Sequence, residues 1–191
     1  MVLSKYMYLV LFTSLVLLLT SCRTKKPQGE GYKNYPDMSM IVRDNLRPFK
    51  TFPKSFLITN GIGAKKDSQR ILASKIDWKY WEGTLLKTNI YNKRFDHHYK
   101  LTPLSEEMST TITYMYEPED ITLKTKKVNV VLDAFTNQVQ SIYVEYSDPG
   151  FFSSESYKIL FVYGKFIQIQ ERTKKPFQKL KETVQQIYFM E

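Results

Sequence analysis

Much of the chain between residues 109 and 171 alternates apolar and polar positions with the period of two that β-strands require. In 139–146, for example, Ile142, Val144 and Tyr146 share one face, and more polar residues lie between them. Six runs rich in Thr, Val, Ile, Tyr and Phe are predicted to be strands: 83–91, 109–116, 121–132, 139–146, 157–163 and 165–171. Because the connections are short, consecutive strands should pair antiparallel as a meander.

The period changes near the C-terminus, where Phe177, Leu180, Val184 and Ile187 follow one another at intervals of 3, 4 and 3 residues. This spacing predicts an amphipathic helix that starts near Pro176 and buries Leu180 and Val184. Weaker patterns predict three further elements: a helical turn over 39–46, a strand over 55–59, and a short helix from 67 or 68 to 76.

These elements predict an α+β fold for a single domain over residues 39–191. Its centre is one curved antiparallel sheet of about six strands with the amphipathic helix at the C-terminal end. The alternative is a small closed β-barrel of calycin-like shape with that helix outside.

The N-terminus differs in character from the rest of the chain. After Lys5, an apolar run of 14 residues extends from Tyr6 to Leu19. As a helix it would measure about 21 Å, which is short of the ~30 Å hydrocarbon core but suits the apolar region of a signal peptide. Residues 1–21 are therefore predicted to be a signal peptide.

The residues that follow this run, Leu19, Thr20, Ser21 and Cys22, resemble the lipobox of bacterial lipoproteins, and Cys22 is the only cysteine in the chain. The resemblance covers residues 1–22 alone and implies that signal peptidase recognises Leu19, Thr20 and Ser21. It also implies a diacylglycerol and an N-acyl chain on Cys22, which together anchor a protein durably to a membrane. No other cofactor is expected.

Residues 22–38 are polar, with two prolines and two glycines, and predict a lipidated N-terminus followed by a flexible tether. Some envelopes send lipoproteins to the cell surface through an acidic cluster after the cysteine. Here Arg23, Lys25 and Lys26 carry the opposite charge. The predicted location is therefore a cell membrane, held by the lipid anchor, and the periplasmic face of the outer membrane is favoured over the inner membrane and the cell surface.

The net charge of +9 is concentrated near this N-terminus. Residues 22–75 contain twelve Lys and Arg against four Asp and Glu, whereas residues 76–191 contain fifteen of each. The basic segment is predicted to contact anionic lipid headgroups or another envelope component, and no nucleic acid is expected in that compartment. The residues assigned to this contact are Arg43, Arg47, Lys50, Lys54, Lys65, Lys66 and Arg70.

The chain contains few residues of the types that form catalytic or metal sites. The only two histidines follow Asp96, and on an extended chain Asp96 and His98 would share a face without His97. Two ligands are fewer than the three or four of a zinc site, and no serine stands in a nucleophile elbow. We therefore expect no catalytic residues and no metal.

Trp78, Tyr80 and Trp81 lie beside the acids Asp77 and Glu82, as in surfaces that hold sugars, so they are a candidate glycan or partner surface. The sequence thus predicts a non-enzymatic envelope lipoprotein that binds or scaffolds another component. The alternative is a periplasmic lipoprotein that binds a small ligand or glycan in a barrel-like pocket. An open sheet with an apolar patch would favour the first, and a void of several hundred Å³ the second.

Overall fold

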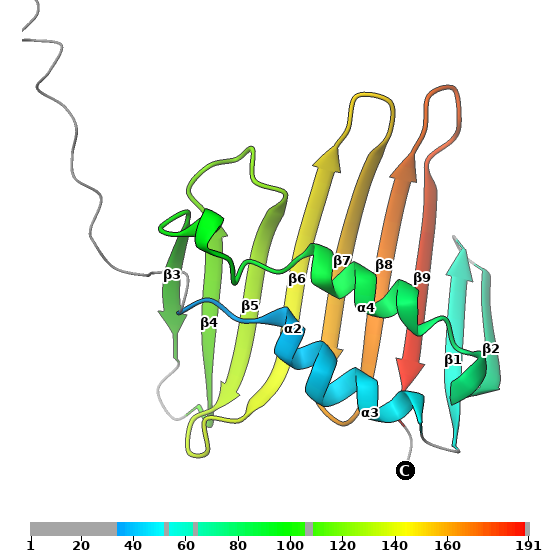
Figure 1. Cartoon of the computed structure of the whole chain (residues 1–191), viewed down its shortest axis with the longest axis horizontal. Coiled ribbons are helices and arrows are strands. Elements are labelled where there is room, and N and C mark those ends of the chain that lie inside the picture. Colours follow the sequence, from blue (N-terminus) through cyan, green and yellow to red (C-terminus); the bar gives the residue numbers. More distant parts are fainter. Residues whose placement is uncertain (1–33, 52–53, 63–64, 106–108, 190–191) are drawn as a thin grey trace, which may run out of the picture.

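A single sheet of nine antiparallel strands forms the body of the protein in the computed structural model, which describes residues 34–51, 54–62, 65–105 and 109–189 (Figure 1). The strand order is β2-β1-β9-β8-β7-β6-β5-β4-β3. The strands are β1 Ser55–Ile62, β2 Lys65–Leu72, β3 Tyr99–Leu104, β4 Thr111–Pro118, β5 Thr125–Asp133, β6 Val139–Pro149, β7 Ser154–Val162, β8 Phe166–Lys174 and β9 Lys181–Tyr188.

This topology corrects the predicted fold class. The antiparallel meander is present from β3 to β9, but the fold is not an α+β arrangement with a C-terminal helix. The calycin-like barrel is also wrong, because β2 and β3 remain the two edges of the sheet in the described part of the chain.

The predicted C-terminal helix is replaced by strand β9, which pairs with β8 on one side and with β1 on the other. Ile187 is fully buried on the sheet, whereas Phe177 and Leu180 are exposed in the turn before the strand. The helical spacing therefore combined turn residues with strand residues. Thr183, Val184 and Ile187 are β-branched, and two open strand edges provide the hydrogen-bond partners that stabilise a strand here.

Two further predicted elements have the wrong type. The predicted strand 83–91 contains the second half of helix α4, Trp78–Lys87, which begins at the N-cap Asp77. Asp77 accepts a hydrogen bond from the backbone N–H of Tyr80 at 3.1 Å. The predicted helix 67–76 is mostly β2, a polar edge strand whose exposed side chains show no apolar alternation.

One face of the sheet is covered by α4 and by a continuous N-terminal helical segment (Figure 1). That segment comprises α2 Met38–Ile41, a π-helical turn Val42–Leu46, and α3 Arg47–Lys50. The wide turn precedes Pro48, whose ring would clash with the carbonyl four residues earlier in a regular helix. No helix among the described residues is both long and apolar enough to cross a membrane.

The core lies between these helices and the covered face. Met38, Val42 and Leu46, spaced four residues apart, are each buried on the underside of the helical segment. From the sheet, the buried positions include Ile142, Val144, Ile159, Phe161, Ile167, Ile169 and Ile187. Short helical turns at Ala73–Lys75 and Lys93–Phe95 connect α4 to β2 and β3.

The antiparallel order sorts the turns into two groups. The turns β1–β2, β4–β5, β6–β7 and β8–β9 lie at one end of the sheet, which is uppermost in Figure 1 and is called the upper end here. The turns β3–β4, β5–β6 and β7–β8 lie at the lower end.

Candidate functional site: an apolar cleft

An apolar cleft of about 770 Å³ lies between the N-terminal helical segment and the covered face of the sheet. It occupies the part of that face that the helices leave open, over strands β3 to β7. Its volume falls within the range of about 300–1,000 Å³ that is typical of small-molecule sites.

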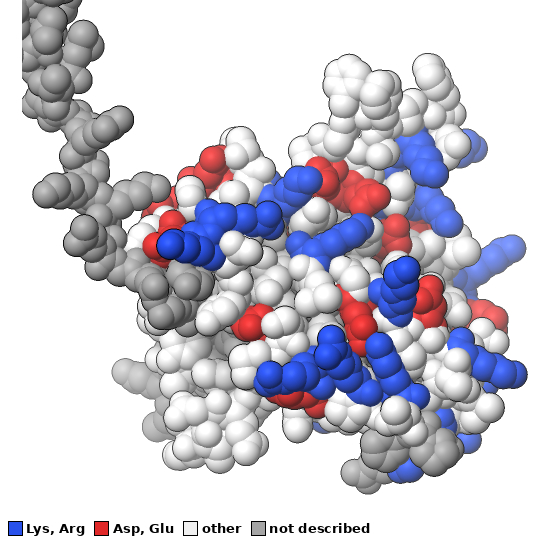
Figure 2. Space-filling model, in the orientation of Figure 1, with Lys and Arg blue, Asp and Glu red and all other residues white. Residues whose placement is uncertain are grey.

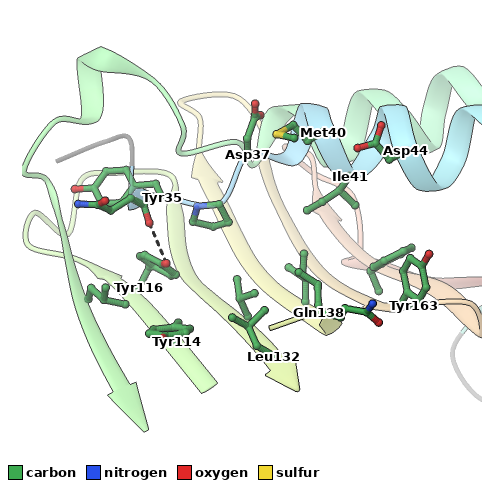
Figure 3. Close-up of a pocket in the computed structure, with 17 residues that line it drawn as sticks. Tyr35, Asp37, Met40, Ile41, Asp44, Tyr114, Tyr116, Leu132, Gln138 and Tyr163 are labelled. Carbon is green, nitrogen blue, oxygen red and sulfur yellow. Dashed lines mark hydrogen bonds between the residues drawn. The ribbon is translucent and has the colours of Figure 1, made fainter. Parts of the chain in front are cut away.

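The cleft has a roof from residues 34–44 and a floor from the strands. Figure 3 shows Met40, Ile41 and Asp44 on the helical side, facing Tyr114 and Leu132 on the sheet. Apolar and aromatic side chains dominate the lining, namely Tyr35, Pro36, Met40, Ile41, Leu101, Tyr114, Tyr116, Val130, Leu132, Val139, Ile142, Phe161 and Tyr163, with Asn34, Asp37, Asp44 and Gln138 as the polar members.

Hydrogen bonds to two tyrosines fix the start of the roof. The Tyr35 hydroxyl donates to the carbonyl of Tyr99 at 3.2 Å and accepts from its N–H at 3.1 Å. The Tyr116 hydroxyl donates to the carbonyl of Asn34 at 3.0 Å, as the dashed line in Figure 3 shows. Burial raises the pKa of Tyr99 to about 12, so its hydroxyl stays protonated and donates to the carbonyl of Thr125 at 3.0 Å.

Asn89, just after α4, holds the next part of the roof. Its Oδ1 accepts from the N–H of Met38 at 3.2 Å, and its Nδ2 donates to Asp37 at 3.0 Å. Tyr35 and Met38 fall within the predicted tether 22–38, yet both side chains are buried in the body. The folded body therefore begins before residue 39, and the roof is preformed.

The charge of the lining indicates which ligand charge the cleft can accept. Among the described residues, the cleft is lined by two carboxylates, Asp37 and Asp44, and by no Lys, Arg or His. Asp44 forms an ion pair with Arg43 at 2.7 Å, and the hydrogen bond from Arg43 lowers the pKa of Asp44. An anionic headgroup would meet no cation here, so the lining favours a neutral apolar molecule.

The structure divides the predicted basic residues between different surfaces. Arg43, Arg47 and Lys50 lie on the helical segment, where Figure 2 shows a row of cations, and Lys50 pairs with Glu82 at 2.6 Å. Lys54 is exposed just before β1, and Lys65, Lys66 and Arg70 are exposed on edge strand β2. Arg70 pairs in register with Leu57, so it projects from the face opposite to the helices.

The aromatic cluster is divided between the core and a second pocket. The Trp78 side chain is buried, and its Nε1 donates to the carbonyl of Ala73 at 2.8 Å. Tyr80 and Trp81 line a more polar pocket of about 380 Å³, where the Tyr80 hydroxyl donates to Glu171 at 3.0 Å. Burial, together with the charge of Glu171, raises the pKa of Tyr80. Glycan binding at this pocket stays a prediction.

The remaining predicted site residues, Leu19, Thr20, Ser21 and Cys22, lie outside the described residues. Within the described residues, no group of three or more His, Cys, Asp or Glu could hold a metal ion. Comparison with family models, curated proteins and solved structures finds no match for this chain.

No sequence pattern predicted that the cleft residues form a site. The floor comes from strands whose apolar positions were predicted correctly as sheet, so their pattern indicates burial and does not distinguish a filled core from an open cleft. One available signal was Tyr35-Pro36-Asp37, an aromatic residue before a helix N-cap, inside the segment that was predicted to be a tether.

Proposed function

We propose that this protein is a membrane-anchored envelope lipoprotein that binds a neutral apolar ligand in the cleft beneath residues 34–44. The observation that carries the proposal is the cleft itself, which combines a volume of about 770 Å³ with an apolar lining and a preformed roof. The proposed role is ligand binding, because the described lining is mostly apolar and aromatic.

The covered face of the sheet favours one of the two functions predicted from the sequence. The sheet is open, as expected for a scaffolding module, but its covered face carries an apolar cleft of about 770 Å³. Such a void supports the ligand-binding alternative, with the difference that the roof is a helical segment and not a barrel wall.

Substitution of Cys22 by Ala should release the protein from the membrane. The lipobox-like residues motivate this prediction, because Cys22 is the only residue that can carry the thioether-linked lipid. Incorporation of a radiolabelled fatty acid and sedimentation with membranes are the two measurements. Wild-type labelling in the Cys22→Ala variant would show that the anchor is elsewhere or absent.

The cleft can be tested with two fluorescent molecules, neutral Nile red and the anionic 11-(dansylamino)undecanoic acid. We expect Nile red to bind at least about tenfold more tightly, because an apolar lining with two carboxylates rejects a buried anion. Leu132→Trp places an indole in the cleft and should weaken Nile red binding about tenfold or more.

Val131→Trp is the matched control, because residue 131 neighbours Leu132 on β5 but projects from the opposite face of the sheet. Nile red affinity should be unchanged in this variant. Equal losses in the two variants, with unchanged melting temperatures, would mean that the dye binds elsewhere and would reject the cleft as the site.

A further inference from the structure

Four of the five most exposed large apolar side chains among the described residues lie in turns of the upper end, and the fifth, Phe135, lies in the β5–β6 turn at the lower end. Phe151 and Phe152 form the β6–β7 turn, and Phe151 is 95% exposed. Phe177 in the β8–β9 turn is fully exposed, and so, nearly, is Ile121 in the β4–β5 turn. Large apolar residues grouped in this way mark a surface that contacts something other than water.

The two aromatic turns project as a pair. Strands β6 to β9 are consecutive in the sheet, so the β6–β7 and β8–β9 turns lie close together, and Figure 1 shows both extending beyond the other turns. Figure 2 shows their ends as two uncharged protrusions.

The backbone of each aromatic turn has a local constraint. At Gly150 an added Cβ would stand 2.5 Å from the carbonyl oxygen of Ser153, so the β6–β7 turn requires glycine there. Phe177 has a left-handed φ of 59°, a conformation that is uncommon for a bulky side chain. Both turns therefore have a specific backbone geometry, and their aromatic rings are exposed.

Cations lie beside the β8–β9 and β1–β2 turns at the upper end, whereas the β4–β5 turn there carries Glu119 and Asp120. Residues 174–181 contain four lysines and no carboxylate, and Figure 2 shows cations at the base of this hairpin. Lys65 and Lys66 follow the β1–β2 turn at the same end. The described lower-end turns 133–138 and 163–165 contain one carboxylate and one lysine.

The described chain begins at the β3 edge of the sheet, beside the upper halves of β3 and β4 (Figure 1). Asn34 is held by Tyr116, near the upper end of β4, and Tyr35 is held by Tyr99, the first residue of β3. Twelve peptide bonds separate Asn34 from Cys22 and can span at most about 40 Å. The distance from the body to the membrane depends on the proposed lipidation of Cys22, whereas the exposure of the aromatic and basic turns does not.

We propose that the upper end of the sheet docks on a lipid bilayer that contains anionic headgroups. Phe151, Phe152 and Phe177 enter the interface between headgroups and acyl chains, where aromatic rings are favourable. The lysines of residues 174–181 contact the phosphates. In this orientation the part of the cleft lined by Gln138, Val139 and Tyr163, at the lower end of the sheet, faces away from the bilayer.

Depth-dependent quenching of tryptophan tests the docking with the full chain. The protein is reconstituted in vesicles of phosphatidylcholine and phosphatidylglycerol at about 3:1, with brominated acyl chains as the quencher. Phe152→Trp and Phe177→Trp place tryptophans in the two turns, and Phe135→Trp places the control in the β5–β6 turn at the lower end. The native Trp78 and Trp81 are buried in the protein and give a constant background.

Brominated lipid should reduce the fluorescence of the introduced tryptophan about twofold or more at residues 152 and 177. At residue 135 the fluorescence should stay within about 10% of its value in vesicles without bromine. Equal quenching at all three positions, or none at any of them, would overturn the proposal. Fatty-acid labelling of Cys22 is measured on the same samples, so loss of the anchor and loss of docking give different results.

The lysines are tested in the Phe177→Trp background. Replacing Lys174, Lys175 and Lys179 by Gln should lower quenching at least about twofold, and raising salt from ~50 to ~200 mM should do the same to the unchanged chain. The control replaces Arg43, Arg47 and Lys50 by Gln, which removes equal charge from the helical segment. An equal effect of both triple variants would assign the contact to the helical segment and overturn the assignment to the turn.

Discussion

A chain that ends at Leu180 should lose cooperative folding altogether. Such a truncation removes β9, which is the only link between β8 and the β1–β2 hairpin in the described sheet. It also removes Ile187 and Phe189, whose buried side chains contribute about 1.5–3 kcal/mol each. Together with two lost strand pairings, this is comparable to the whole stability of a domain, about 5–15 kcal/mol.

The measurement is urea unfolding followed by near-ultraviolet circular dichroism. The truncated chain should show no cooperative transition, while a control that ends at Phe189 keeps every described strand pairing and should unfold like the full chain. A sharp transition with an unchanged midpoint in the shorter chain would contradict the assignment of β9 to the centre of the sheet.

Phe56→Ala should produce the largest loss of stability among single substitutions that we consider, about 3–5 kcal/mol. Phe56 is 2% exposed on β1 and joins three elements of the core. Its ring makes edge contacts with Phe49 of α3 at 5.6 Å and with Trp78 of α4 at 5.9 Å. Removal of the ring therefore opens a cavity where both helical layers meet the sheet.

With a urea dependence of about 1–3 kcal/mol per molar, the expected loss lowers the unfolding midpoint by roughly 2 M. Phe135→Ala is the matched control because that ring is 81% exposed in the β5–β6 turn, and it should change stability by less than about 0.5 kcal/mol. A loss below about 1 kcal/mol for Phe56→Ala would show that the helices do not pack on β1 as described.

The sequence was informative where each strand has two different faces. Strands β4 to β8 follow the period-two pattern, and their antiparallel order follows from short connections such as the Gly164 turn, where φ is +65°. It was misleading where tertiary pairing overrides local pattern. Polar β2 and β9, with few apolar positions, become strands because β1 and β8 offer hydrogen-bond partners.

Helix α4 was missed for a different reason. Gly83 and Thr84 are weak helix formers in its middle, so the segment from residue 83 looked like the start of a strand. Trp78, Trp81 and Leu85 nonetheless repeat at helical spacing, and all three are buried. The cleft depends on this helix through Asn89 and on distant strands, so no local pattern could have located it.

The two edge strands bear on the membrane anchoring that we propose. An unpaired strand edge is a template for joining another copy, and confinement to a surface increases the frequency of such encounters. Strand β2 carries Lys65, Lys66 and Arg70, so two such edges repel each other, and β3 contains Pro103, which lacks a backbone donor. These residues thus oppose polymerisation of the protein through its strand edges. Lys65, Lys66 and Arg70 have this effect whether or not an anion binds them.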